Sequence, residues 1–508
     1  MDDRLVADSR PGAAGRCLAL CRPGAAPGAL REPLFPRLTP PPGRRADPRG
    51  AGGPNAAARP VGVPTGGAGR VIAAVGAVVN RLLYPPSHVL LLFGGATLAS
   101  NLVWYGSGLF IGRLPGIALM LAGLVTGMTA LVLLRRRHQL AGLAVFILAA
   151  VGLPAIALMT LRWRTGAPIL LHDGAYQTEQ AMQLLLSGRD PYGMDYTQTS
   201  MAHWHWYVNL PLDPALFHYV YNPLTFLAAI PFDMLTNLAQ VPFDFRLVLL
   251  VAAVLAALGL TALPWGWELR YVALAALFLD PFFYLPQGRN DMLFLAAVIG
   301  GTLAWSRNRP VAATWSFGIA LAFKQFSLFF IAPLAVALLA TRHRGRLSTR
   351  STLLALGGLL VPVAVTVLPF LLWNPVAYWT DTVGVVTGTA PDSFPIRGFG
   401  IAELMLVLHL LPGPNAYFPF GLLQAAIALP ILAGGLPRLW RESSAASILA
   451  VGAWSTVGAL LASRYLNDSH LAMLVFLLIL AGAAKRAEQP EAAGRLDSSS
   501  PASSAAAA

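Results

Sequence analysis

Four short polar segments interrupt an otherwise apolar chain, and they hold the residue types that could do chemistry. The first contains His172 and Asp173, and a carboxylate of this kind can accept a proton from a bound hydroxyl group. The other three are Gln287-Gly288-Arg289-Asn290-Asp291, Lys324-Gln325 and the run from Arg464 to His470. Ionisable groups are costly at or inside a bilayer and usually face a cavity or a partner. We therefore treat the four segments as candidate parts of one site.

Lys324 is the most informative cation in these segments. Lysine occurs only here and at Lys485 in a chain with 36 basic residues, and Lys324 lies between Phe323 and Phe326 in apolar sequence. One interpretation is that its ammonium group snorkels to the lipid headgroups. The other is that it meets a phosphate group, which a guanidinium such as that of Arg289 would also suit.

Residues 171–193 predict a short helix that lies on the membrane surface, with Asp173 at its entrance. Gly188 and Pro191 are expected to end this helix. Asp173 could cap the helix, which is worth about 1 kcal/mol, or it could act as a base, and the two roles are compatible. The apolar residues that can share one face are Ala175, Met182, Leu185 and Leu186.

Aromatic residues are concentrated after this helix. The segments are Arg189-Asp190-Pro191-Tyr192, His203-Trp204-His205-Trp206-Tyr207 and His218-Tyr219-Val220-Tyr221-Asn222-Pro223. Tryptophan and tyrosine concentrate at membrane interfaces, which is one account of them. The alternative is a platform on which sugar rings stack.

His203 and His205 could bind a metal with Asp173, but an alternating pair without a third spaced ligand is a weak signal, and we expect no metal site.

The elements that must position these residues are membrane helices. Hydrophobic residues make up 56% of the chain and charged residues 12%, with a mean hydropathy of +0.61, whereas about a quarter of the residues of soluble proteins are charged. Residues 114–134, 247–267 and 352–373 carry no charge and are long enough to cross a bilayer. They are apolar on every face, which favours helices over barrel strands. The sequence predicts an all-α, polytopic transmembrane bundle of about 11–14 helices.

Positive charge predicts the orientation of this bundle. The basic loops 135–137, 307–309 and 342–346 are expected in the cytoplasm, which places segment 161–215 outside. Counting back from loop 342–346 places Gln287 outside as well. Two residues on the same side of the membrane are separated by an even number of crossings, yet three apolar segments lie between Asp173 and Gln287. We expect segment 216–236, with its two prolines, to be broken or re-entrant; otherwise one basic loop is misleading. The expected helices lie near residues 87–105, 114–134, 139–160, 216–236, 246–264, 271–286, 292–305, 311–325, 327–341, 352–373, 399–412, 416–436, 446–463 and 470–484.

Both ends of the chain predict disordered tails. Residues 1–70 are rich in Pro, Gly and Ala and contain eleven Arg against five acidic residues, which indicates a basic, disordered and cytoplasmic N-terminal tail. No apolar core of a signal peptide follows the first charges. Residues 486–508 form the second predicted tail, and residues 71–485 the membrane domain. We assign the formal charge of +13 to helix orientation and not to nucleic-acid binding.

The polar segments together resemble a known family. An acidic residue before an interfacial helix that ends in Gly-Arg-Asp-Pro-Tyr (188–192) is followed by Tyr-Asn-Pro-Leu (221–224), Gln-Gly-Arg-Asn-Asp (287–291) and Ala-Phe-Lys-Gln-Phe (322–326). This pattern resembles the GT-C superfamily of membrane glycosyltransferases, and most closely the polyprenyl-phosphate-mannose-dependent mannosyltransferases of glycosyltransferase family 87. The resemblance covers roughly residues 85–485. It implies a multi-pass cell-membrane protein with the interfacial helix in its first large outward loop.

The resemblance also implies a reaction. The donor would be a polyprenyl-phosphate-linked sugar, with mannose expected, and the acceptor a hydroxyl group of a lipid-linked or envelope glycan at the outer face. Transfer would be an inverting single displacement with Asp173 as the base and no cofactor, and no glycine-rich nucleotide loop occurs in the sequence. Arg289, Lys324 and either Arg464 or His470 would stabilise the leaving phosphate. The other implied substrate-binding residues are His172, Arg189, Tyr192, Tyr221, Asn222, Gln287, Asn290, Asp291 and Gln325.

Two other classes of function stay open at this point. A transporter or lipid or glycolipid flippase would also need charges within the membrane, although the internal repeats of many transporters are absent. A scaffold subunit of an envelope assembly would use the polar segments for contacts alone. A further outward segment with Asp392, Arg397 and Glu403 could form a lid over the site or a solvated loop.

Overall fold

The computed structural model describes residues 152–168, 170–203, 213–279 and 285–489. These residues belong to the larger of two compact units, 66–508. They are mostly helical, and their one pair of strands joins β1 (Arg397–Gly398) to β2 (Tyr465–Leu466) in parallel. The predicted all-α class is therefore confirmed. The predicted helices at 87–105 and 114–134, most of the one at 139–160, residues 204–207 and nearly all of both predicted tails lie outside the described residues.

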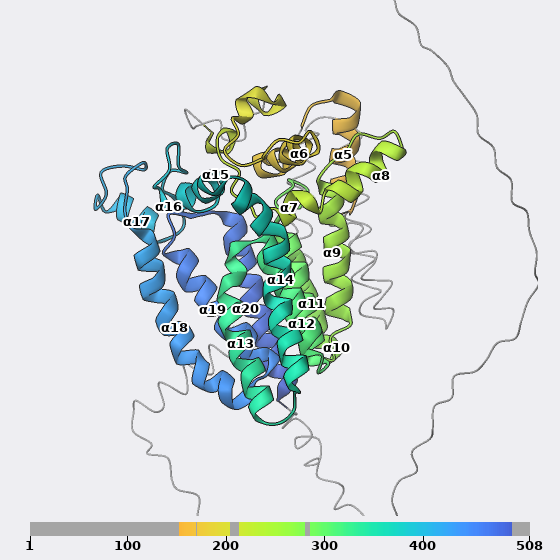
Figure 1. The fold of residues 1–508 in the computed structure, drawn as a ribbon, viewed down its shortest axis with the longest axis vertical. Coiled ribbons are helices and arrows are strands. Elements are labelled where there is room, and N and C mark those ends of the chain that lie inside the picture. Colours follow the sequence, from red (N-terminus) through yellow and green to blue (C-terminus); the bar gives the residue numbers. More distant parts are fainter. Residues whose placement is uncertain (1–151, 169, 204–212, 280–284, 490–508) are drawn as a thin grey trace, which may run out of the picture. The chain divides into compact units, whose positions relative to one another are not determined.

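The longer helices lie side by side in a bundle (Figure 1). Within it α12 contacts α11 and α14, α19 contacts α18 and α20, α9 contacts α11, and α10 contacts α20. Four helical segments of 19–25 residues are long and apolar enough to cross a membrane, namely 325–343, α14, α18 and α20. The bundle helices are α9 (Arg246–Thr261), α10 (Trp267–Leu279), α11 (Asp291–Ser306), α12 (Pro310–Phe323), α13 (Leu328–His343), α14 (Thr349–Trp373), α18 (Phe420–Glu442), α19 (Ala445–Leu461) and α20 (Asp468–Glu488).

Local sequence explains where these helices start and how closely they pack. Ser444 accepts a hydrogen bond from the backbone N–H of Ser447 at 3.2 Å and so caps α19, while proline stands at the first position of α12. Both devices deal with backbone N–H groups that have no partner inside a helix. A Cβ atom at Gly318 of α12 would collide with the backbone of Gly358 in α14, so glycine is what lets these two helices approach.

Shorter elements lie at one end of the bundle (Figure 1). They include α6, which is the predicted interfacial helix, and η6, a single π-helical turn. Their bounds are α5 (Leu153–Thr165), α6 (Asp173–Leu186), η2 (Tyr196–Gln198), η3 (Ser200–His203), η4 (Pro214–Leu216), α7 (Leu224–Leu227), α8 (Ile230–Leu238), η5 (Gln325–Ser327), α15 (Pro375–Trp379), η6 (Thr380–Gly384), α16 (Val385–Thr387) and α17 (Ile401–Val407).

The structure resolves the even-number conflict in the predicted crossings. Segment 216–236 is not one helix but is broken into α7 and α8, with Pro223 directly before α7 and Pro231 in the first turn of α8. A proline lacks the N–H that a helix interior needs, and breaks follow. Among the described residues between the two polar segments, α9 and α10 are then the two longer bundle helices, and the N–H of His172 donates to the carbonyl of Gln287 at 2.6 Å. Both segments therefore lie at the same end.

Several predicted helix bounds are wrong. The helix predicted at 399–412 is the shorter α17, which ends before His409 at a backbone φ of 56°. The helix predicted at 416–436 starts later and runs to Glu442. α10 starts at residue 267 rather than 271, and α20 extends over Asp468–Glu488, whereas the helix was predicted near 470–484.

A buried network of charges fixes α6 to the bundle. Arg162 of α5 donates to both oxygens of Glu179 in α6, at 2.8 and 2.6 Å, and to Asp244 at 3.1 Å. Asp244 also accepts from Arg246 at 2.7 Å, and Arg246 donates to the carbonyl of Pro286 at 3.2 Å. This chain of contacts ends one residue before Gln287, so it sets the position of the second polar segment relative to α6.

Candidate active site

The start of α6 presents Asp173 in a buried setting. His172 is the N-cap residue, and its Nδ1 accepts from the N–H of Gly174 at 3.0 Å. Asp173 Oδ1 accepts from the same N–H at 2.6 Å and lies 2.6 Å from His172 Nδ1. A Cβ atom at Gly174 would collide with the hydroxyl group of Tyr221. Glycine at this position therefore lets Tyr221 approach the carboxylate from the side of the pocket.

Two carboxyl groups near this helix start have opposite pKa shifts. Burial alone would raise the pKa of Asp173, but His172, the N–H of Gly174 and Arg289 together hold it below its usual value. Burial and the charge of Asp173 raise the pKa of Asp213 to about 7. Asp213 Oδ1 accepts from the N–H of Ala215 at 3.0 Å, at the start of η4. At neutral pH Asp173 is ionised, while Asp213 is partly protonated.

Two cations face the same space, and each is paired with a carboxylate. Lys324, between α12 and η5, is only 6% exposed and forms an ion pair with Asp291 at the start of α11. Arg289 donates to Asp468 of α20 at 2.7 Å and to Gln287 at 3.2 Å. The Lys324 side chain is thus buried within the bundle and does not snorkel to the headgroups. The Lys324 ammonium group carries three N–H donors, so it can bond to a ligand as well as to Asp291.

These groups line one cavity of about 450 Å³, which we call the Asp173 pocket. Its polar end holds His172, Asp173, Arg289, Asp291 and Lys324. Further polar side chains line it as well, and the apolar part of its wall comes from Val220, Phe326, Leu328, Phe329, Val383, Val386, Phe394 and Leu460. Leu328 and Val386 are 60% and 44% exposed on the outer surface of the molecule. The pocket therefore joins a charged end to an apolar wall that reaches the surface of the bundle.

The structure brings together most of the residues named from the sequence. The Asp173 pocket is lined by His172, Asp173, Tyr221, Arg289, Asn290, Asp291, Lys324, Gln325 and His470. Asn222 and Tyr192 lie behind this lining. Asn222 donates to the carbonyl of Leu321 at 2.8 Å, and the Tyr192 hydroxyl donates to the carbonyl of Tyr221 at 2.8 Å. Gln287 supports Arg289, and Arg189 is exposed.

Arg464 is placed differently from the other predicted cations. Its guanidinium donates to the backbone carbonyls of Phe394, Ala416 and Pro414 at 2.6, 2.7 and 3.3 Å. It does not line the Asp173 pocket. Its contacts instead hold together two loops, one of which carries Phe394 into the pocket wall.

Some lining residues were not identified from the sequence. They are Gln177, Thr382, Val383, Val386, Thr387, Phe394 and Gln424. Thr382 and Val383 belong to η6, and π-helical turns occur often at functional sites. The only sequence signal near them was the outward segment that begins at Asp392, two residues before Phe394.

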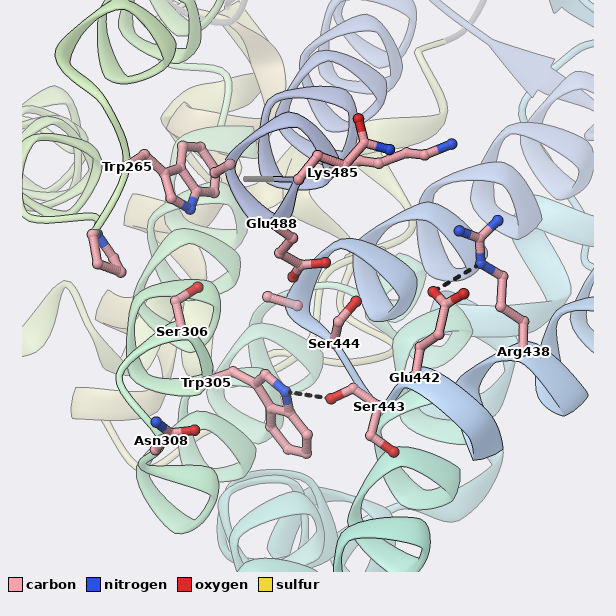
Figure 2. A pocket seen from close by; sticks show the side chains of 14 residues that line it. Trp265, Trp305, Ser306, Asn308, Arg438, Glu442, Ser443, Ser444, Lys485 and Glu488 are labelled. Atoms are coloured by element: carbon pink, nitrogen blue, oxygen red, sulfur yellow. Dashed lines mark hydrogen bonds and ion pairs between the residues drawn. The ribbon is translucent and has the colours of Figure 1, made fainter. Parts of the chain in front are cut away.

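A second cavity of about 740 Å³, which we call the Trp305 pocket, lies at the ends of α11 and α20 that are opposite to the Asp173 pocket. Figure 2 shows its lining. Trp305 donates to the carbonyl of Ser443 at 3.1 Å, and Arg438 pairs with Glu442 at 3.0 Å within α18. The Arg438 and Glu442 side chains are 53% and 49% exposed. None of the residues predicted to bind substrate lines this pocket.

Comparison with known proteins agrees with the motifs. No curated protein matches the chain. Residues 219–464 match the model of glycosyltransferase family 87. This match covers most of the bundle and most residues of the Asp173 pocket, whereas Asp173 itself lies outside it, on the N-terminal side. By this match, residues 219–464 are similar to glycosyltransferase family 87, which indicates a glycosyltransferase.

Proposed function

We propose that the protein transfers a sugar from a polyprenyl-phosphate donor to a hydroxyl group of a lipid-linked or envelope glycan. One observation carries the proposal: Asp173, Arg289 and Lys324 line a single pocket that also has a large apolar part of its wall, including Leu328, Phe329 and Val386. A polyprenyl-phosphate sugar has the matching parts, with a charged phosphate between a polar ring and a hydrocarbon chain. Mannose is the proposed sugar, on the motif resemblance to family 87.

The two cations are proposed to bind the phosphate of the donor. As the bond between the anomeric carbon and the phosphate oxygen breaks, negative charge grows on the phosphate. Preorganised donors in a site shielded from water stabilise such charge strongly. Lys324 is buried and Arg289 is held between Gln287 and Asp468, so both are already fixed near the place where this charge would develop.

Asp173 is proposed to accept the proton of the acceptor hydroxyl. The acceptor oxygen bonds to the anomeric carbon from the side opposite the phosphate, and its proton passes to the carboxylate, so the anomeric configuration inverts. In an oxocarbenium-like transition state the attacking hydroxyl becomes more acidic as its bond forms. A carboxylate with a lowered pKa, which is fully ionised at neutral pH, can therefore serve as the base.

The orientation of the pocket follows from the basic loops. Loops 307–309 and 342–346 adjoin the ends of α12 and α13 that are far from Lys324. The positive-inside tendency assigns such loops to the cytoplasm. The Asp173 pocket is then proposed to face the outer side of a cell membrane that the chain crosses several times.

A transfer assay tests the proposed function. The purified protein in lipid nanodiscs would be given radiolabelled polyprenyl-phosphate mannose and a lipid extract containing acceptor glycans. Label is expected to move to acceptor, and Asp173→Asn is expected to slow transfer by about 10²-fold or more with unchanged thermal unfolding. Glu403→Gln, which changes a carboxylate that does not line the pocket, is the matched control.

Two outcomes would contradict this proposal. Near-normal transfer by Asp173→Asn would remove Asp173 as the base. If wild-type protein transferred no label from mannose or another polyprenyl-phosphate hexose, yet moved the donor across vesicle membranes, the protein would be a flippase.

A further inference from the structure

His218 lies between two partners that both accept hydrogen bonds. Its Nδ1 is 2.8 Å from Asp381 Oδ1, and its Nε2 is 2.7 Å from the carbonyl oxygen of Pro391. A neutral imidazole carries one N–H, so it can donate to only one of them. The imidazolium carries two N–H groups and donates to both. The geometry of this buried side chain is therefore that of the cation.

Asp381 ties several segments to His218. Its second carboxylate oxygen accepts from the N–H of Gly193 at 2.8 Å and of Tyr219 at 3.3 Å. It lies in η6, directly before the pocket-lining Thr382 and Val383. The carboxylate thus joins the chain after α6, the segment leading to Tyr221 and the wall of the Asp173 pocket.

Residues 388–396 are held against the pocket from two sides. His218 bonds to the carbonyl of Pro391, and Arg464 bonds to the carbonyl of Phe394 at 2.6 Å. Phe394 lines the pocket. An arginine stays charged at any pH at which proteins are folded, whereas a histidine can lose its charge near neutral pH. One attachment of this segment is therefore permanent and the other can titrate.

We propose that His218 and Asp381 are positioning residues, which hold segment 388–396 and η6 in place as the wall of the donor pocket while the imidazole is charged. When His218 loses its proton, its one remaining N–H stays with the charged acceptor Asp381. The bond to the carbonyl of Pro391 is then lost, and the segment keeps Arg464 and its own backbone bonds. The consequence for sugar transfer rests on the proposed function, whereas the attachment itself does not.

The surrounding charges agree with a cationic imidazole. Burial alone would lower the pKa of His218, but Asp381, the Pro391 carbonyl and Asp392 together raise it above its usual value. Asp190 lies close enough to interact with Asp381, which contributes to its raised pKa. Tyr192 and Tyr196 also face Asp381, and their pKa values are raised well above 10, so they stay neutral. A raised histidine pKa means that the attachment is complete below about pH 6.5 and is lost as pH rises through the raised value.

Asp213, which is near His218 among the described residues, has a pKa that is raised into the same range. Its pKa is raised to about 7, and it begins the η4 turn that leads to His218. The Asp213→Asn variant keeps a capping side chain and removes this titration. It therefore serves as the background in which the effect of His218 is isolated.

Hydrogen exchange in nanodiscs tests the attachment directly. Exchange at the imidazole ring, followed by mass spectrometry, is expected to give His218 a higher pKa than a histidine in an unstructured peptide. Backbone exchange at Thr389 and Ala390, whose N–H groups bond to the carbonyl of Gly384, is expected to lose about 10-fold in protection as pH rises past the His218 midpoint. Rates are corrected for intrinsic exchange with an unstructured peptide.

Three variants define the result. His218→Gln keeps a donor near Nε2 and is expected to abolish the pH dependence, while Asp381→Asn is expected to move the midpoint at least about one unit lower. His409→Gln is the control and is expected to behave as wild type. In wild-type protein the KM for the donor is expected to rise with pH more than kcat falls.

The outcomes separate the two proposals. Unchanged exchange at Thr389 and Ala390 in both His218→Gln and Asp381→Asn would overturn the positioning role. A pH dependence that disappears in Asp213→Asn alone would assign it to Asp213 and also overturn the role of His218. If hydrogen exchange behaves as expected but the protein transfers no sugar, the attachment through His218 is supported and the proposed function is rejected.

Discussion

Helices α11 and α20 each run from the Asp173 pocket to the Trp305 pocket, so the two cavities share walls but differ in how they hold charge. In the Asp173 pocket the ion pairs join residues 33 and 179 positions apart, and Lys324 and Asp291 are buried. In the Trp305 pocket Arg438 and Glu442 are one turn apart on α18 and half exposed. A buried pair costs desolvation that a half-exposed pair does not. Charges retained at that cost are the better candidates for chemistry.

The largest expected effect comes from Lys324→Met. This change leaves Asp291 buried and uncompensated, which is expected to lower the free energy of unfolding by about 3–5 kcal/mol and to abolish transfer. The double variant with Asp291→Asn is expected to recover most of the stability but not the transfer. Thermal unfolding and the label assay measure the two effects. Recovered transfer in the double variant would mean that Lys324 serves stability alone.

Arg289→Ala is expected to separate function from stability. Its partner Asp468 is 46% exposed, so water can solvate that carboxylate once the guanidinium is removed, and the loss of stability should be at most about 1 kcal/mol. Transfer is expected to fall by about 10²–10³-fold because a donor to the leaving phosphate is lost. Asp468→Asn, which keeps the cation, is the control and should retain most of the transfer. Equal losses in these two variants would contradict a direct role for Arg289.

Asp213→Asn is expected to change how stability depends on pH. The pKa of Asp213 is raised in the folded protein to about 7, so the unfolded chain releases this proton at lower pH and stability falls between about pH 4 and 7. The variant lacks this fall, and its gain over wild type should reach about 4 kcal/mol at pH 8 and shrink at pH 5, because each unit of pKa shift corresponds to about 1.4 kcal/mol. Melting temperatures in nanodiscs at both values measure it. A gain that is equal at the two pH values would show that the carboxyl group does not titrate in this range.

The smallest effect is expected in the Trp305 pocket. A double-mutant cycle of Arg438→Met and Glu442→Gln should give a coupling of about 0.3–0.5 kcal/mol, typical of exposed pairs one helical turn apart. Transfer should be unchanged in each variant. A coupling of several kcal/mol would remove the contrast between the two pockets.

The sequence predicted the helical class and most of the polar end of the site. Asp173, Arg289 and Lys324 were identified because charge within apolar sequence is costly and therefore conspicuous. The break of segment 216–236 followed from counting crossings, and its prolines explain it.

The rest depended on tertiary contacts that no local pattern encodes. Arg464 has the same sequence signal as Arg289, yet its guanidinium bonds to three backbone carbonyls instead of lining the pocket. Phe394 and Val386 lie in segments with no period or motif, and only the folded loop brings them to the cavity. His218 looked like one member of an aromatic run, and its pairing with Asp381 spans 163 residues.

The exposed positions of Leu328 and Val386 at the edge of the Asp173 pocket have a consequence for how a substrate is encountered. A lipid carrier that enters between them never leaves the plane of the bilayer, so its search for the enzyme is diffusion in two dimensions. Under the proposed function, the concentration that governs saturation is then the mole fraction of donor among the surrounding lipids. Diluting the donor with inert phospholipid should slow the enzyme, whereas adding buffer at constant lipid composition should not.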